Sequence, residues 1–460
     1  MAGWTDPLNL IKEELVQRRD EGCRIPEDLG RRIEALGEGD AWNYERIDPL
    51  YDELMQLEED GGRAAREPND LEAIRALRPE GPRDLGWRPD ADTLFDRLHG
   101  AITGRCMGCA LGKPVEGMAI SRGRKPVEQY LRNRGDWPLR DFFSNRDVGD
   151  GMTLGCPAST REHIAYMEPD DDIHYTLTGL GVLEQAGPDF TWRDVGRYWA
   201  QHIPITAICT AERQAFMNLL NRSKAGSGGP ATPEFTRRHR NPYREWIGAQ
   251  IRADGLAFAC AGKPELAAEF AWRDAHWTHE RNGIYGEMFI AAAEAAAFVE
   301  ADPRRLIEIG LSEIPAECRL ALHVRQVLAW VESCPTWDQC MAKVEATLPQ
   351  MNGVHTINNA LICVLSLFYG RMDSIDVTTI AVMCGLDTDC NGATVGAIVG
   401  AATGRRAMRD DLARRLNDRI RVHMLGFTDT TMSEVAERFG AVWQRTDEYA
   451  RTRTADAARQ

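Results

Sequence analysis

The stretch GAITGRCMGCALG, residues 100–112, decides the fold, because its glycines fall at every fourth position. The same spacing returns in NGATVGAIVGAATG, residues 391–404. In a helix each glycine costs about 1 kcal/mol relative to alanine, so each of the two glycine stripes forfeits roughly 3–4 kcal/mol of helix propensity. A glycine stripe lets two helix backbones approach closely, which offsets that cost. We therefore predict two tightly packed core helices that face each other.

Two clusters of aspartates each precede a helix-like segment. The stretch EPDDDIHYT places Asp170, Asp171 and Asp172 in a row. Asp387 and Asp389 stand two residues apart, just ahead of the second glycine stripe. Acidic residues can gather at a helix start merely because the helix dipole favours them, by about 0.3–1 kcal/mol each. Two crowded clusters instead favour a Mg²⁺ or Mn²⁺ site, because these ions prefer carboxylate oxygens and neither cluster has the pattern of a zinc site.

The composition excludes several classes of partner. The formal charge of −15 argues against nucleic acid, whose phosphates need a basic surface. The longest apolar run, near residues 360–369, is too short to span a bilayer, and the start of the chain lacks the layout of a signal peptide. The cysteines show no framework spacing, which predicts free thiols in a reducing compartment. We expect a cytoplasmic protein with no membrane partner.

The periodicity of apolar residues is mainly helical, and alternating β-branched runs are scarce, which predicts an all-α fold. The clearest helices are expected at 254–272, 284–300, 303–311, 317–332, 336–347, 357–369 and 374–384. Residues 1–93 are expected to form an appended N-terminal helical arm that ends in a Gly- and Pro-containing segment. We expect a catalytic domain over 94–450 and a flexible tail over 451–460.

Two further features adjoin the first glycine stripe. Glu116 follows it in GKPVE, after the turn-forming pair Lys113 and Pro114. Taken alone, Glu116 is an ordinary loop glutamate, whereas beside a metal it is a plausible catalytic carboxylate. Cys106 and Cys109 form a CxxC pair, but no second pair accompanies it and both thiols lie inside the stripe. Buried packing is therefore favoured over zinc binding or thiol exchange.

Four segments, in this order, resemble the ADP-ribosylglycohydrolase family over residues 95–445. They are GAITGRCMGCALGKPVEG, DDDIHYTLTGL, DAHWTHERNGIYGEMF and GLDTDCNGATVGAIVGA. The resemblance implies an all-α, orthogonal multi-helix bundle with a binuclear Mg²⁺ or Mn²⁺ site. It also implies hydrolysis of an N- or O-glycosidic bond at the anomeric carbon of an ADP-linked ribose.

By this resemblance, the metal ligands are Asp171, Asp172, Asp387 and Asp389, with Asp389 as the bridging ligand. The chain departs from the family pattern at two ligand positions, where Asp170 and Cys390 replace threonines. Aspartate keeps an oxygen donor at its position, so Asp170 is also expected as a ligand. Cysteine instead offers a soft thiol where Mg²⁺ prefers oxygen. We expect two ions, with the site next to Cys390 weakened or shifted toward Mn²⁺.

Cleavage of a ribosyl bond passes through an oxocarbenium-like transition state and needs an activated water. We expect Asp171 or Glu116 to be the base, with Asp172 as a third catalytic carboxylate. A diphosphate would be held by backbone amides around Gly151. Other expected substrate contacts lie in the matched segments: His174, His279, Tyr285 and Asn391.

The leading hypothesis is a metal-dependent hydrolase of ribosyl N- or O-glycosides, including ADP-ribosylated substrates. One alternative is a hydrolase of a small N-riboside or nucleotide metabolite, for example one derived from NAD, which the departures from the motifs favour. An alternative of another class is a non-catalytic protein that binds ADP-ribose or a nucleotide. The arm is expected to pack beside the cleft or to form a homodimer contact.

Overall fold

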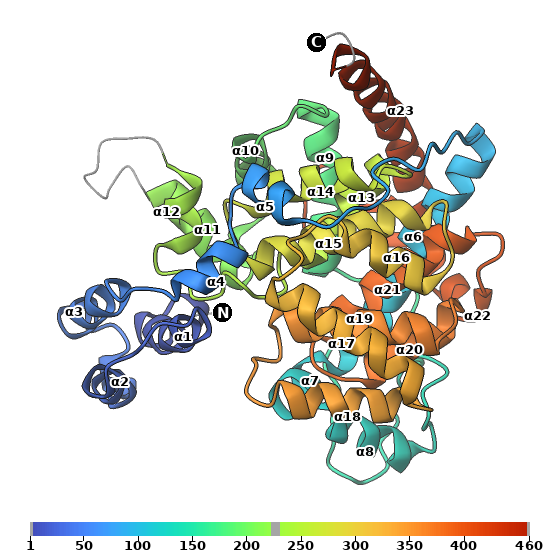
Figure 1. Ribbon diagram of the computed structural model, residues 1–460. Coiled ribbons are helices and arrows are strands. Elements are labelled where there is room, and N and C mark those ends of the chain that lie inside the picture. Colours follow the sequence, from blue (N-terminus) through green and yellow to red (C-terminus); the bar gives the residue numbers. More distant parts are fainter. Residues whose placement is uncertain (1–2, 222–230, 458–460) are drawn as a thin grey trace.

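The computed structural model describes residues 3–221 and 231–457, and this part of the chain is almost entirely helical (Figure 1). The arm contains α1 (Pro7–Asp20), α2 (Glu27–Glu34), α3 (Tyr44–Met55), α4 (Gly61–Arg66) and α5 (Leu71–Leu77). The main body begins with α6 (Ala91–Gly112), α7 (Glu116–Arg122), α8 (Arg124–Arg134), α9 (Asp171–Ala186), α10 (Trp192–His202), α11 (Thr210–Asn221) and α12 (Pro233–Arg238). It continues with α13 (Ala253–Ala257), α14 (Pro264–Ala275), α15 (Asn282–Ala297), α16 (Pro303–Leu311), α17 (Arg319–Ser333) and α18 (Trp337–Thr347). It ends with α19 (Thr356–Tyr369), α20 (Ser374–Met383), α21 (Thr388–Thr403), α22 (Asp410–Ala413) and α23 (Met432–Ala457).

Short elements connect these helices. The 3-10 turns used below are η1 (Gly3–Thr5), η3 (Lys113–Val115) and η8 (Phe258–Cys260). The strands β1 (Arg419–Arg421) and β2 (Asp429–Thr431) pair antiparallel, with Ile420 opposite Thr430. The all-α prediction is therefore confirmed for the described residues.

Helices α6 and α21 pack against each other along the two glycine stripes, as the sequence predicts. A Cβ atom on Gly104 would overlap the backbone carbonyl of Gly396, and one on Gly108 would overlap that of Gly392. Only glycine permits this approach of two backbones. The close contact fixes the start of α21 beside the end of α6, which matters for the site.

The helix predicted over 254–272 is interrupted in the structure. It is divided into α13, the turn η8 and α14. Gly262 has a φ of +80°, which a residue inside an α-helix cannot have, and Pro264 lies at the start of α14. Proline is tolerated in the first turn of a helix but not in its interior. The prediction followed the apolar periodicity and missed these two breaking residues.

The arm has a small hydrophobic core of its own, built from Leu8, Ile11, Leu15, Leu29, Ile33, Leu36, Ile47, Leu50, Tyr51 and Leu54. It lies at one side of the main body, near α11 and α12 (Figure 1). Leu10 of α1 packs with Ala211 of α11 and with Tyr243. The arm therefore packs against the main body of its own chain.

Helix α23 continues through Ala457, so residues 451–457 are helical and the expected flexible tail is corrected there. Arg451 lies one turn beyond Asp447, with 2.9 Å between Nη2 and Oδ2, and such a pair supports a helix. Residues 458–460 lie outside the described residues. All twelve cysteines are free, as predicted. No helix within 3–221 or 231–457 is long and apolar enough to cross a membrane.

Candidate metal centre and active site

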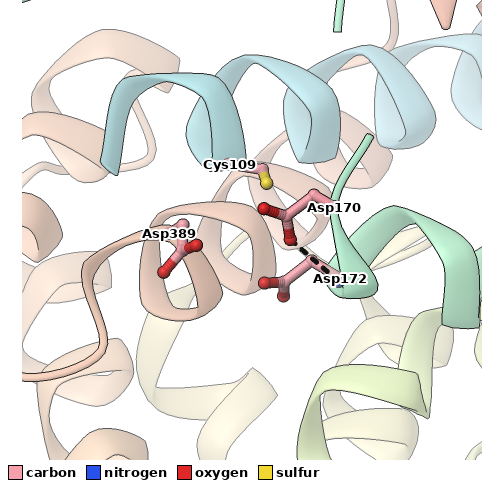
Figure 2. A group of neighbouring side chains, drawn as sticks. All are labelled: Cys109, Asp170, Asp172 and Asp389. Atoms are coloured by element: carbon pink, nitrogen blue, oxygen red, sulfur yellow. Dashed lines mark hydrogen bonds between the residues drawn. The ribbon is translucent and has the colours of Figure 1, made fainter. Parts of the chain in front are cut away.

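The packing of the glycine stripes brings the two acidic clusters together. The Thr388 hydroxyl, in the first turn of α21, donates a hydrogen bond of 2.8 Å to the carbonyl of Gly112, the last residue of α6. Asp170 is the N-cap of α9, where its side chain accepts a hydrogen bond of 3.0 Å from the Asp172 N–H. Asp387 is the N-cap of α21. The starts of α9 and α21 therefore meet beside the end of α6 (Figure 2).

Two groups of side chains at this junction could hold an ion. Cys109, Asp170, Asp172 and Asp389 each offer a ligand atom, and these atoms all lie within 4.8 Å of one another (Figure 2). Asp387, Asp389 and Cys390 form the second group. The structure thus brings together five of the expected ligands. Asp171 belongs to neither group.

In the first group, Asp170 and Asp172 already have protein partners. Lys113 Nζ lies 2.7 Å from Asp170 Oδ2, and Arg105 Nη2 lies 3.2 Å from Asp172 Oδ1. The Cys390 thiol donates to Asp172 Oδ2 at 3.2 Å. Burial raises the pKa of Asp170, but Lys113 and the Asp172 N–H outweigh it, so the pKa of Asp170 is lowered. Asp170 is therefore a carboxylate whose charge a lysine already balances.

Asp387 and Asp389 differ, because Oδ1 of each is buried and has no hydrogen-bond partner in the described chain. Burial, and then the charge of Asp389, raises the pKa of Asp387 well above its usual range. Burial, and then the charge of Asp170, raises the pKa of Asp389 to about 6. A buried polar atom without a partner costs free energy unless a proton or cation satisfies it. These oxygens fit a hard divalent cation, whereas the Cys390 thiol is a poor donor for one.

A cavity of about 300 Å³ adjoins this pair. Its wall includes Glu116, Asp171, Asp387, Asp389 and Cys390. Two of the three expected catalytic carboxylates, Glu116 and Asp171, therefore face the same space as the unpartnered pair. Asp172 does not line the cavity, because it is fully buried between Arg105 and Cys390. A catalytic role for Asp172 stays a prediction, although its side chain does not face this cavity.

Both cavity carboxyl groups have a raised pKa. Burial, followed by the charges of Asp170 and Asp389, raises the pKa of Asp171 to about 8. For Glu116 the charge of Asp389 comes first and burial second, and together they raise the pKa well above its usual range. A carboxyl group with a pKa of about 8, such as that of Asp171, can exchange protons near neutral pH.

Several other residues of the cavity wall escaped the sequence analysis, among them Trp4, Cys209, Glu212 and Trp246. None belongs to an acidic cluster or a glycine stripe, and a single tryptophan or glutamate carries no distinctive spacing. Trp4 comes from η1, at the very start of the arm. The arm is therefore part of the cavity wall.

The two histidines expected to contact substrate do not line the cavity. His174 Nε2 accepts a hydrogen bond of 2.9 Å from the backbone N–H of His423. His279 is fully buried, and its Nδ1 lies 2.8 Å from the Thr278 hydroxyl. Burial lowers the pKa of His174 to about 4 and that of His279 well below its usual range. Both are neutral histidines held within the protein interior.

The other three expected contacts do not line this cavity either. Gly151 is exposed in the loop before α9 and lies outside the cavity wall. The Tyr285 hydroxyl is used by the arm, because it donates to the Pro68 carbonyl. Asn391 is fully buried and donates a hydrogen bond of 2.8 Å to Asn359. Tyr285 and Asn391 belong to matched segments, but their side chains bond to other parts of the protein.

The fold and the site define an all-helical protein with a buried carboxylate pair suited to a divalent cation. Residues 90–448 match the family model described as ADP-ribosylglycohydrolase. The chain therefore belongs to the ADP-ribosylglycohydrolase family, as the resemblance predicted. Membership indicates a glycosyl hydrolase, and the family is generally metal-dependent.

A solved structure described as an "ADP-ribosylglycohydrolase-related protein complex" is similar to this chain at 19% sequence identity. The alignment covers 77% of this chain and 99% of that one, with a TM-score of 0.48. No protein in the search of curated proteins matches.

Proposed function

We propose that this protein is a metal-dependent hydrolase that cleaves the bond between the anomeric carbon of a ribosyl group and its leaving group. The observation that carries the proposal is the pair Asp387 and Asp389, whose unpartnered oxygens adjoin a cavity also lined by Glu116 and Asp171. Family membership supports the reaction class. A cation-binding pair and two nearby carboxyl groups are suited to hydrolysis of a glycosidic bond.

A bound divalent cation would polarise the ribose hydroxyls and offset negative charge in the cavity. Asp387 and Asp389 hold it in this proposal. Asp171, with a pKa of about 8, carries a proton at neutral pH and suits the role of proton donor to the leaving group. Glu116 owes its raised pKa first to the charge of Asp389, so offsetting that charge makes Glu116 the acceptor of a proton from the attacking water.

Activity on a panel of ribosyl compounds tests this function. The panel contains ADP-ribosyl-arginine and ADP-ribosyl-serine peptides, O-acetyl-ADP-ribose, NAD-derived nucleotides and free ribosides, each with and without Mn²⁺ or Mg²⁺. We expect release of ribose or ADP-ribose only when the metal is present. Tight binding without release from any compound would favour the non-catalytic alternative and refute the hydrolase.

We further propose that one ion is held tightly instead of two. The Lys113 ammonium is only 10% exposed and already balances Asp170, so it takes the place of a second cation. The first group also includes the Cys109 thiol, whose pKa burial raises well above its usual range, so this sulfur stays protonated. A neutral thiol is a poor ligand for Mg²⁺ or Mn²⁺.

Counting bound Mn²⁺ by electron paramagnetic resonance and equilibrium dialysis tests the number of ions. We expect about one per chain in the wild type and a second, weaker one in Lys113→Met. Lys125→Met removes an exposed lysine outside this junction and serves as the matched control. Two tightly bound ions in the wild type would contradict the proposal.

A further inference from the structure

The thiol of Cys390 lies among oxygen donors at the candidate metal centre. Cys390 follows Asp389 directly in the chain and shares a ligand group with Asp387 and Asp389, whose ligand atoms all lie within 4.8 Å of one another. The side chain is 6% exposed, and it lines the same cavity as both aspartates. A cation that enters this cavity therefore meets one sulfur and two carboxylates together.

A chain of hydrogen bonds orients this thiol. Its S–H donates to Asp172 Oδ2 at 3.2 Å. The buried Arg105 guanidinium in turn holds Asp172, because Nη2 donates to the Asp172 carbonyl at 2.9 Å and to Oδ1 at 3.2 Å. Arg105 Nε lies 2.6 Å from Asp254 Oδ2, which fixes the guanidinium. Groups placed in this way behind a metal ligand orient it and are worth about 10–100-fold in affinity.

The two aspartates give an independent sign that a ligand belongs beside the sulfur. Oδ1 of Asp387 and Oδ1 of Asp389 are buried without a hydrogen-bond partner in the described chain. Together with the Cys390 sulfur they make three protein ligands, the number used by zinc sites that keep one position open. Carboxylate oxygens alone suit Mg²⁺ or Mn²⁺, whereas a cysteine sulfur in the same group shifts the preference toward Zn²⁺.

The other thiol of this junction is placed differently. Cys109 belongs to the first ligand group, beside Asp170 (Figure 2). It is fully buried and is not among the described residues of the cavity wall. Lys113 Nζ lies 2.7 Å from Asp170 Oδ2, so this group already contains a cation of the protein itself. Cys390 is therefore the thiol that an entering ion can reach.

We propose that Asp387, Asp389 and Cys390 form a site for a thiophilic divalent cation of the Zn²⁺ class, which excludes Mn²⁺ and Mg²⁺ from the centre. This inference rests on the cation site of the proposed function and concerns its regulation by a competing ion. When the sulfur binds the cation, the S–H bond breaks and its proton passes along the existing hydrogen bond to Asp172 Oδ2. The electron pair of that bond stays on sulfur and forms the bond to the metal. Because the two aspartates serve both kinds of ion, Zn²⁺ and Mn²⁺ compete for one place.

Absorption spectroscopy of the full chain loaded with Co²⁺ tests the sulfur ligand directly. Co²⁺ substitutes for Zn²⁺, and a sulfur bound to it gives an intense charge-transfer band in the near ultraviolet. We expect this band in the wild type, its loss in Cys390→Ser and its retention in Cys209→Ser. Cys209 is the matched control, because it lines the same cavity but belongs to neither ligand group. No band in the wild type, or a band that survives Cys390→Ser, would overturn the inference.

Metal affinity supplies a second test. Most protein sites bind Zn²⁺ more tightly than Mn²⁺, so the diagnostic quantity is the change in that preference on substitution. Displacement of Mn²⁺ by Zn²⁺, followed by electron paramagnetic resonance, measures it. Because Cys390→Ser replaces the sulfur by an oxygen, we expect the affinity for Zn²⁺ to fall at least about tenfold and that for Mn²⁺ to stay equal or rise. Cys209→Ser should keep the wild-type preference. An unchanged Zn²⁺ affinity, or an equal loss of both ions, in Cys390→Ser would contradict the role of the sulfur.

The inference and the proposed hydrolase fail in distinguishable ways. A cobalt–sulfur band that depends on Cys390, without hydrolysis of any ribosyl compound, would retain the inferred metal site and reject the hydrolase. Hydrolysis that needs Mn²⁺ or Mg²⁺, by a protein without this band, would retain the hydrolase and reject the inferred metal site.

Discussion

Carboxylates removed from solvent in two regions of this molecule are treated in opposite ways. Where the arm meets the main body, each has an arginine: Glu14 and Glu21 share Arg244, and Glu59 contacts Arg238 and Arg281. At the cavity, the Oδ1 atoms of Asp387 and Asp389 have no partner among the described residues.

The pKa values express the same difference. Burial raises the pKa of Glu59, but the hydrogen bond from Arg238 and the charge of Arg281 outweigh it and lower the pKa to about 2. At Asp389 burial prevails and the pKa is raised to about 6. A buried carboxylate matched by arginine holds two parts of a protein together. One left unmatched costs stability, and beside a cavity it is the expected signature of a binding site. The predictions below test this division.

The largest effect is expected from removing the arginine at the centre of the arm interface. Arg244→Met leaves Glu14 buried without its arginine and Glu21 with Arg18 alone, and burial already raises the pKa of Glu14. Breaking a buried ion pair from one side costs about 3–5 kcal/mol. We expect a loss of that size in the free energy of unfolding, measured by urea denaturation, and faster proteolysis of the arm.

The control is an ion pair on the surface of the same arm. Arg31 is 69% exposed and lies 3.7 Å from Glu27, one helical turn away. Such pairs contribute at most about 0.5 kcal/mol, so Arg31→Met should leave stability almost unchanged. If Arg244→Met lowers the free energy of unfolding as little as Arg31→Met does, the buried ion pairs do not hold the arm.

The next largest effect concerns the unmatched pair. Asp389→Asn keeps the shape of the side chain but removes the charge, and we expect at least about a hundredfold loss of Mn²⁺ affinity by calorimetry. Such a loss corresponds to about 2.7 kcal/mol. Without metal, the variant should be as stable as the wild type or more stable, because a buried charge without a partner has been removed.

Replacing a carboxylate of the arm by its amide should instead lower stability and leave Mn²⁺ binding intact. Glu14→Gln is expected to retain Mn²⁺ binding and to lose about 1–3 kcal/mol of stability, since it weakens the neutralisation of buried Arg244. If Asp389→Asn bound Mn²⁺ normally, or if Glu14→Gln abolished Mn²⁺ binding, the division between structural and functional carboxylates would be wrong.

The sequence predicted the part of the site that depends on local pattern. The glycine spacing of the two stripes required close backbone contact, and that contact brings the start of α21 to the end of α6. This contact places Asp387 and Asp389 beside the end of α6, and it also places Glu116, which begins the helix after η3. These positions could be found because each lies within a few residues of a stripe.

The remainder depends on contacts between distant residues that no local pattern encodes. Lys113 reaches Asp170, and Trp4 reaches the cavity on an arm that Arg244 pairs with through two glutamates. His279 lay in a matched motif, but its ring lies in the interior, since a motif fixes the position of the backbone and not what the side chain contacts. Long-range charge pairing was therefore what the sequence analysis missed.

The smallest predicted effect is the response of the arm to acid. The folded pKa of Glu59, about 2, lies below its ordinary value of 4.5, so Glu59 stabilises the docked arm at every pH above that ordinary value. This contribution is lost as the pH falls from about 4.5 toward 2. Because Glu59 is partly exposed, we discount the shift for solvent screening and expect about 1–2 kcal/mol.

Hydrogen exchange of α1 and α3, followed from pH 6 to pH 3, measures this response. In the wild type we expect the protection of the arm to fall below about pH 4.5 and that of α6 and α21 to fall less. Glu59→Gln should begin with lower protection at pH 6 and should lose the part of the pH dependence that Glu59 supplies. Glu72→Gln, at a carboxylate 77% exposed, should follow the wild type. If Glu59→Gln left the protection of the arm and its pH dependence unchanged, the prediction would be wrong. The arm would then be stabilised by its apolar contacts, and the arginine pairs would only orient it.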